Sequence, residues 1–173
     1  AMNPCPCGYL GDTSGRCHCS AEQIQRYRGK LSGPLLDRID LHVEVPSLPA
    51  QDLLAPASPA ETSTAVRARV SAARERQQAR QGCINRALPP AALEQHCALD
   101  DSARKLLTQA LERLGLSARA VHRIIRVART IADLDISPQI RVPHLAEAVQ
   151  YRKLDRLPAT RLVSTPAGGR LGR

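Results

Sequence analysis

The distribution of large apolar residues constrains this chain more than any other feature. Phe and Trp are absent and only three Tyr occur, so a core must be built from aliphatic side chains. Such residues recur at helical spacing in two stripes, the first made of Ala103, Leu106, Leu107, Ala110, Leu111 and Leu114 and the second of Val121, Ile124, Ile125, Ala128 and Ala132. Asp100 and Ser117 precede the stripes at N-cap positions, and Gly115 follows the first. We therefore expect two capped helices that bury their stripes against one another in a bundle that folds independently.

Other segments also have helical signals. Residues 61–81 predict a long polar helix that ends at Gly82 and is exposed over most of its circumference, because it has few large apolar residues. Residues 89–97 begin with prolines suited to a helix start, and residues 142–155 predict a last helix. Near the beginning, Ser20 and Gln23 form a capping-box pattern for a short helix that ends at Gly29 or Gly33. Cys83 and Cys97 are expected to be a loop thiol and a small core residue. The fold class is therefore mainly α.

One segment predicts a strand. Apolar and polar residues alternate over "IDLHVEVP", with Ile39, Leu41, Val43 and Val45 on one face and Asp40, His42 and Glu44 on the other. Pro46 ends the run. A single strand cannot satisfy its backbone groups without neighbours. It either pairs with residues 1–4, or its sheet is formed by chain outside this sequence.

The chain divides into four regions by composition. Residues 1–46 hold a Cys/Gly/Pro-rich loop and the predicted strand, 47–60 read as a Pro/Ala/Ser linker, 61–157 as the helical part and 158–173 as a flexible tail. The net charge differs between the first two regions and the helical part. Residues 1–60 have 5 Lys/Arg and 6 Asp/Glu, net −1, whereas residues 61–157 have 17 Lys/Arg and 10 Asp/Glu, net +7. This bias favours a phosphate-bearing partner, or it is a solvated arginine surface. No membrane-length apolar run or signal peptide is present, and we expect a soluble, cytoplasmic protein that makes no membrane contact.

Four cysteines lie within "CPCGYLGDTSGRCHCS", as the pairs Cys5/Cys7 and Cys17/Cys19. Reducing conditions inside cells disfavour structural disulfides, so the cluster predicts metal binding. Four thiolates make a closed, structural Zn²⁺ site, with no open position for catalysis, and His18 could replace one sulfur. The alternative is a set of free thiols on a mobile loop.

Longer motifs connect the chain to a known family. The stretches "AMNPCPCG", "SGPLLDRIDLHVEVP", "LSARAVHRIIRVARTIADL" and "HLAEAVQYRKLDR" resemble the second half of the AAA+ module in the magnesium chelatase-like family that includes competence protein ComM and YifB. The resemblance covers most of residues 1–157. It implies that Asn3 is the sensor 1 residue, Arg38 the arginine finger and Arg119 the sensor 2 residue, which contacts ATP phosphate. It also implies that the first 46 residues end an α/β core and that the helical part is the lid with an inserted helix. Arg123 and Arg126 follow Arg119 at helical spacing and are expected to face solvent.

The sequence contains neither a G-x-x-x-x-G-K-[ST] phosphate loop nor an Asp-Glu pair after an apolar strand. The resemblance therefore implies the C-terminal piece of a larger ATPase, inactive alone, whose parent uses ATP and Mg²⁺. That parent is expected to be a hexameric motor for DNA branch migration in natural transformation, with other subunits and DNA as partners. Three alternatives remain: part of a magnesium chelatase subunit with a porphyrin-binding partner, an autonomous zinc-stabilised nucleic-acid-binding module, or a helical part that is mainly an interaction surface.

Overall fold

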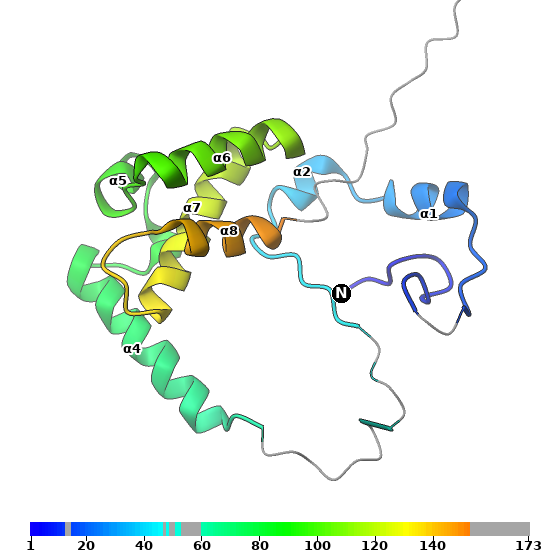
Figure 1. The fold of residues 1–173 in the computed structure, drawn as a ribbon, viewed down its shortest axis with the longest axis horizontal. Coiled ribbons are helices and arrows are strands. Elements are labelled where there is room, and N and C mark those ends of the chain that lie inside the picture. Colours follow the sequence, from blue (N-terminus) through cyan, green and yellow to red (C-terminus); the bar gives the residue numbers. More distant parts are fainter. Residues whose placement is uncertain (13–14, 47, 49–50, 53–59, 153–173) are drawn as a thin grey trace, which may run out of the picture.

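The computed structural model describes residues 1–12, 15–46, 48, 51–52 and 60–152, and the fold is mainly α (Figure 1). These residues form seven α-helices and one 3₁₀ helix, and no β-strand occurs among them. Helices α4 to α8 make a bundle, and the cysteine-rich loop and α1 lie to one side of it in Figure 1. Most of the predicted linker and all of the predicted tail lie outside the described residues. No described helix is long and apolar enough to cross a membrane.

The two capped helices are present as predicted. They are α6 (Asp101–Leu114) and α7 (Ala118–Leu134). The Asp100 carboxylate accepts a hydrogen bond from the Ala103 amide at 2.7 Å, and the Ser117 hydroxyl accepts one from the Ala120 amide at 3.2 Å. Gly115 ends α6 in the left-handed conformation, with φ of 61°. Each cap satisfies a backbone group that the helix end leaves unpaired.

A third helix receives both apolar stripes. Helix α8 (Val142–Gln150) packs against α6 and α7, so the stripes converge on α8 instead of facing mainly each other. The core of this bundle consists of Leu88, Leu93, Cys97, Ala103, Leu107, Ile124, Ala128, Ala132, Ile140, Leu145 and Ala148. Apart from Cys97 it is aliphatic, as the composition requires. Cys97 is one of its small residues, and the side chain of Cys83 packs against it.

The polar helix α4 (Ser63–Gln81) packs along α7 and ends at Gly82, which has φ of 72°. Within α4 only Ala73 and Gln77 are buried, so the prediction of a largely exposed helix is confirmed. The 3₁₀ helix η1 (Asn85–Ala87) and α5 (Pro90–His96) follow, and both contact α7. Helix α7 is therefore the central element of the bundle.

The N-terminal part contains α1 (Ala21–Arg28) and α2 (Gly33–Leu36). The predicted capping box of α1 is present: the Gln23 amide donates to the Ser20 hydroxyl at 3.2 Å, and the Ser20 amide donates to Gln23 Oε1 at 2.9 Å. Helix α2 was not predicted. Ser32 caps it, and its first turn contains a proline, two signals that the short "SGPLL" stretch already carried.

The predicted strand at residues 39–45 is wrong. The segment runs beside the end of α8, where the His42 amide donates to the Tyr151 carbonyl at 2.8 Å, and no strand within the described residues pairs with it. The expected burial of one face is absent: of residues 39–45 only His42 is buried, 7% exposed, while Leu41 is 46% and Val45 87% exposed. Without a neighbouring strand a β-ladder cannot form, and contact with the bundle buries His42 alone in this segment.

Candidate functional site

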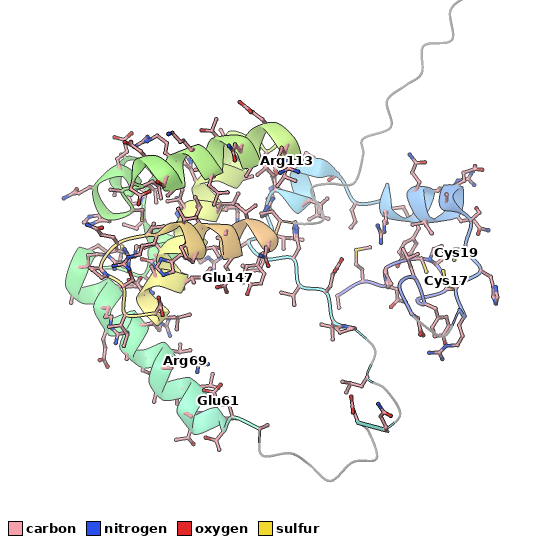
Figure 2. All side chains as sticks on the ribbon, viewed as in Figure 1. Cys17, Cys19, Glu61, Arg69, Arg113 and Glu147 are labelled. Carbon is pink, nitrogen blue, oxygen red and sulfur yellow. The ribbon has the colours of Figure 1, made fainter. Side chains whose placement is uncertain are left out.

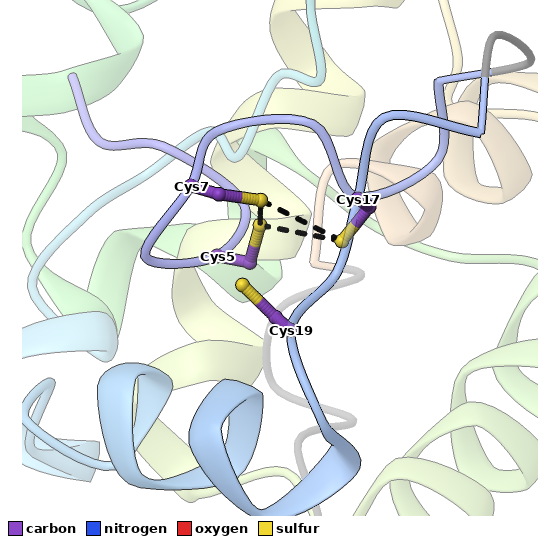
Figure 3. Close-up of side chains that lie close together, drawn as sticks. All are labelled: Cys5, Cys7, Cys17 and Cys19. Carbon is purple, nitrogen blue, oxygen red and sulfur yellow. Dashed lines mark hydrogen bonds between the residues drawn. The ribbon is translucent and has the colours of Figure 1, made fainter.

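The four cysteines of the N-terminal loop come together in space (Figure 3). The Cys5 and Cys7 sulfurs are 3.3 Å apart, Cys5 and Cys17 3.8 Å, and Cys7 and Cys17 3.7 Å. Cys19 completes a group whose four Sγ atoms lie within 4.8 Å of one another. The predicted alternative ligand, His18, is exposed and is not part of the group, in which every ligand atom is a sulfur.

These distances suit a metal better than a disulfide. A disulfide would require about 2.05 Å between two sulfurs, and all six cysteines are free. Zn–S bonds of about 2.3 Å in a regular tetrahedron place the sulfurs about 3.8 Å apart, close to the separations seen here. Four thiol sulfurs from two Cys-x-Cys pairs are also a donor set that Zn²⁺ prefers. The four cysteines could therefore bind a metal ion such as zinc.

The pKa values of the cysteines in the cluster also favour a bound metal ion. Burial would raise the pKa of Cys5, but hydrogen bonds from Cys7, from the Leu10 backbone and from the other two thiols hold that pKa at about 6. A backbone hydrogen bond from Cys7 would lower the pKa of Cys19, yet the Cys7 thiol, burial and Cys5 together raise it to about 12. One thiolate thus forms readily and makes the next harder to form. A bound cation is what would let all four ionise together.

The loop holds the sulfurs in place through its backbone. Gly8, Gly11 and Gly15 all have positive φ, of 84°, 87° and 68°, a conformation that residues with a Cβ rarely adopt. The Gly8 amide donates to the Cys5 carbonyl at 3.1 Å, which closes a tight turn around the first Cys-x-Cys pair. Arg28 of α1 donates to the Pro4 carbonyl at 2.9 Å and ties the loop to the helix.

The residues implied as ATPase elements lie on three different segments. Asn3 is exposed at the start of the cysteine loop, Arg38 is exposed in the turn after α2, and Arg119 is exposed in the first turn of α7. Within the described part of the chain, neither the Arg38 nor the Arg119 guanidinium forms a hydrogen bond or ion pair. Both are therefore open to an external anion.

The neighbouring arginines of α7 differ from Arg119. Arg123 forms an ion pair with Asp40, and Arg126 donates to the Leu88 carbonyl from Nε at 3.2 Å and from Nη2 at 2.8 Å. Both are partly buried, so the expectation that they simply face solvent is wrong. Helical spacing placed them away from the apolar stripe correctly, but it could not show that other segments cover that side of α7.

The segment around Arg38 is attached to the bundle by several polar contacts. Asp37 accepts a hydrogen bond from the Ser117 hydroxyl at 2.9 Å and lies 3.6 Å from an Arg152 nitrogen. Arg152 is 1% exposed and also donates to the Ile39 carbonyl. With the Asp40–Arg123 pair, these contacts flank Arg38 on both sides and leave its own side chain outside.

A buried polar network inside the bundle escaped the sequence-based analysis. Asp133 is 1% exposed and accepts hydrogen bonds from Arg80 at 2.5 Å, from Asn85 at 2.8 Å and from Arg129 at 3.2 Å. Arg129, 2% exposed, also donates to the Ser137 and Pro138 carbonyls at 2.6 and 3.0 Å. The available signal was the opposite charge of Arg129 and Asp133 at i, i+4, on the edge of the apolar stripe.

Charge complementarity holds this network together. Burial would raise the pKa of Asp133, but hydrogen bonds from Arg80 and Asn85 and the charges of the two arginines lower it below its ordinary value. Burial lowers the pKa of Arg129, and Asp133 opposes that effect. Because α4, η1 and α7 all contribute side chains, the network fixes how these three elements pack.

Comparison with known proteins identifies relatives of the chain. Residues 60–152 match the family described as "Magnesium chelatase, subunit ChlI C-terminal", and residues 1–53 match the one described as "Magnesium chelatase, subunit ChlI". The chain is 49% identical over 157 residues to "Competence protein ComM" of Haemophilus influenzae, covering 91% of this chain and 30% of that protein. Over the same length it is 46% identical to "Uncharacterized protein YifB" of Escherichia coli and 45% to that of Salmonella typhimurium, in each case over 91% of this chain and 31% of the relative. The chain thus spans about 30% of the length of these curated relatives.

Proposed function

Because the chain belongs to the magnesium chelatase subunit ChlI C-terminal family, we propose that it forms the arginine-finger and lid part of a ComM/YifB-like AAA+ ATPase. The proposed parent is a hexameric motor that performs branch migration of DNA during natural transformation. The observation that carries the proposal is the contrast between the two arginines at the implied ATPase positions and the buried or paired arginines nearby. Arg123, Arg126, Arg129 and Arg152 are engaged within the chain, whereas Arg38 and Arg119 are exposed and unengaged in its described part.

ATP would supply the γ-phosphoryl group whose transfer to water drives the motor. A guanidinium is always charged and can form two parallel hydrogen bonds with phosphate oxygens, which suits both arginines to this ligand. Arg38 would act on the nucleotide of a neighbouring subunit, and Arg119 would contact the nucleotide of its own. Asn3 would orient the attacking water through its side-chain amide.

The proposed nucleotide site needs residues that this sequence does not contain. It has no phosphate loop and no Walker B pair, so ATP and Mg²⁺ would be held mainly by another part of the full-length protein. The present chain alone is therefore expected neither to bind ATP tightly nor to hydrolyse it. Measurable turnover by the purified chain would contradict this division of roles.

DNA is the proposed substrate of the motor. Two facts support it: the net charge of +7 over residues 61–157, from 17 Lys/Arg and 10 Asp/Glu, and the 49% identity to a protein named for competence. We propose that the four-cysteine cluster binds Zn²⁺ and that the metal acts as a structural cross-link of the loop. All four sulfurs would be used as ligands, so the site offers no position for catalysis.

The proposal is tested with the full-length protein. Replacing Arg38 with Ala should reduce ATP hydrolysis by about 10³-fold or more while ATP affinity stays nearly unchanged, because a finger acts chiefly in the transition state. Mixing this variant with a phosphate-loop variant should restore part of the activity. The matched control is Arg113→Ala, an exposed arginine at the end of α6 (Figure 2), with an expected change within about twofold.

Arg119→Ala should behave differently, because the loss of Arg119 weakens nucleotide binding in the same subunit. Its effect should therefore be seen in nucleotide binding, and recovery of activity on mixing should not be what distinguishes it. Movement of a synthetic DNA junction, measured with the same variants, tests the DNA part of the proposal. If Arg38→Ala kept near-normal turnover, the role given to Arg38 would be wrong. If the protein hydrolyses ATP, but DNA does not stimulate the hydrolysis and the protein does not move DNA junctions, a magnesium chelatase subunit would be favoured instead.

A further inference from the structure

The contacts around Arg38 join it to the helix that carries Arg119. Asp37 immediately precedes Arg38, and its carboxylate accepts a hydrogen bond from the Ser117 hydroxyl at 2.9 Å. The same hydroxyl accepts a hydrogen bond from the Ala120 amide at 3.2 Å, and Ser117 is the N-cap residue of α7. Arg119 lies in the first turn that this hydroxyl caps. One oxygen atom therefore connects the backbone turn that presents Arg38 to the helix end that presents Arg119.

A second connection is made by Asp40, two residues after Arg38. Asp40 pairs with Arg123, one helical turn after Arg119 on α7. The Arg123 side chain is 27% exposed and that of Asp40 47%, so the pair is partly shielded by the surrounding chain. Arg152 adds a third connection, because it lies near Asp37 and donates to the Ile39 carbonyl. We call Asp37, Asp40, Ser117 and Arg123 the clamp.

We infer that the clamp couples Arg38 to Arg119, so that the position of the lid over one nucleotide sets the position of the finger offered to the neighbouring subunit. The inference rests on the proposed function, which gives these two arginines sites in different subunits. Rotation of α7 on nucleotide binding would carry Ser117 and Arg123 with it, and both hold the flanks of Arg38. Asp37, Asp40 and Arg123 are thus positioning residues, and Arg38 and Arg119 are the groups that touch phosphate.

The test uses the full-length hexamer and measures ATP hydrolysis, ATP binding and mixing behaviour. Asp37→Ala and Asp40→Asn should each lower kcat by about 10- to 100-fold, the loss expected when a catalytic group is misplaced by about 1 Å. KM and nucleotide affinity should stay within about twofold. The matched control is Glu61→Gln, which removes the ion pair between Glu61, just before α4, and Arg69 of α4, 2.6 Å apart and not part of the clamp (Figure 2).

Two further readouts separate positioning from a merely structural effect. Mixing Asp37→Ala subunits with a phosphate-loop variant should restore activity, because the clamp variant still binds ATP and the other variant still has a well-placed finger. The exchange Asp40→Arg with Arg123→Asp should recover at least a third of the lost activity, since it rebuilds the ion pair with the charges reversed. Thermal unfolding of each variant checks that the subunit is folded.

The outcomes are distinct. If Arg38→Ala abolishes hydrolysis but the clamp variants keep normal kcat and normal cooperativity in ATP, the clamp inference is overturned and the proposed function stands. The inference is also overturned if kcat and ATP affinity fall together, or if the mixed hexamers stay inactive. If Arg38→Ala itself is active, the proposed function fails first, and the clamp fails with it.

Discussion

Removing the charge of Asp133 should destabilise the helical bundle more than any surface substitution. Asp133→Asn keeps the size of the side chain but removes the negative charge from a position that is 1% exposed. Arg129 then remains 2% exposed without its counter-charge, and Arg80 loses its bidentate partner. In the wild type, the groups around the Asp133 carboxylate are N–H donors. The amide introduced by Asp133→Asn adds N–H donors of its own, which find no acceptor among them.

The magnitude follows from burial. Breaking a buried ion pair by changing one partner typically costs about 3–5 kcal/mol, because the remaining charge stays in a poorly solvated position. Arg129 is the main source of that cost here. The Arg80 side chain is 25% exposed, so water can replace part of its lost interaction. Domains of this size have about 5–15 kcal/mol of stability in total, so the variant should be close to unfolding at elevated temperature.

The assay is urea and thermal unfolding of the chain followed by circular dichroism. For a domain of 60–100 residues each kcal/mol corresponds to about 4–8 °C in Tm, so a loss of more than about 12 °C is expected. Glu61→Gln is the matched control, because its carboxylate is 47% exposed and such surface pairs contribute about 0–1 kcal/mol. If Asp133→Asn cost no more than this control, the network would not hold the bundle together, and the argument from burial would be wrong.

The pH dependence provides an independent check. The folded pKa of Asp133 lies below its ordinary value of 3.8, so its stabilising contribution is present above that value and is lost as the pH falls through the folded pKa. The difference in stability between wild type and Asp133→Asn should therefore be constant from about pH 5 to pH 8 and should shrink below about pH 4. A difference that shrank as the pH rose would contradict the direction of the shift.

Three other predictions concern single sites. Metal analysis after purification without chelator should find one Zn²⁺ per chain, which Cys7→Ser should lose and which acidification should release, since thiolate ligands must be deprotonated. Ile136 directly follows the C-cap of α7, has φ of 56° and is 70% exposed, so Ile136→Gly should raise stability by about 1 kcal/mol, whereas Ile136→Ala, which keeps a Cβ, should not. In amide exchange the His42 N–H should be protected with the bundle, because the Tyr151 carbonyl accepts it at 2.8 Å; exchange as fast as in an exposed loop would mean that this segment detaches.

The elements that sequence predicted well are those whose signal is local. Capping by Ser20, Asp100 and Ser117 requires only a side chain and an amide three residues away, so the sequence pattern is nearly sufficient to predict the cap. The apolar stripes of α6 and α7 are local as well, because their period is set by the helix itself. The four cysteines were identifiable because residue type and spacing together restrict the chemistry that brings them together.

The features that sequence missed depend on partners far along the chain. Periodicity assigned Arg129 and Asp133 no special role, because their burial depends on Arg80 and Asn85 about fifty residues earlier. The predicted strand failed for the same reason. The sequence alternates at residues 39–45, but no strand within the described residues pairs with the segment, and its contact with the bundle buries only His42. Residues 47–60 and 158–173 lie largely outside the described structure, so the boundaries predicted there stay predictions.

The same distinction applies to charge, which sequence can count but cannot place. The helical part has 17 Lys/Arg and 10 Asp/Glu, net +7, and that number alone suggested an arginine surface for a phosphate-bearing partner. Four of these arginines are paired within the chain: Arg80 and Arg129 share Asp133, Arg123 pairs with Asp40, and Arg69 pairs with Glu61. An internally paired arginine adds little to the field that a partner meets, because its carboxylate cancels it at close range. For the proposed phosphate contacts, the exposed Arg119 is therefore a better candidate than the paired Arg123 on the same helix, and Arg38 is likewise exposed.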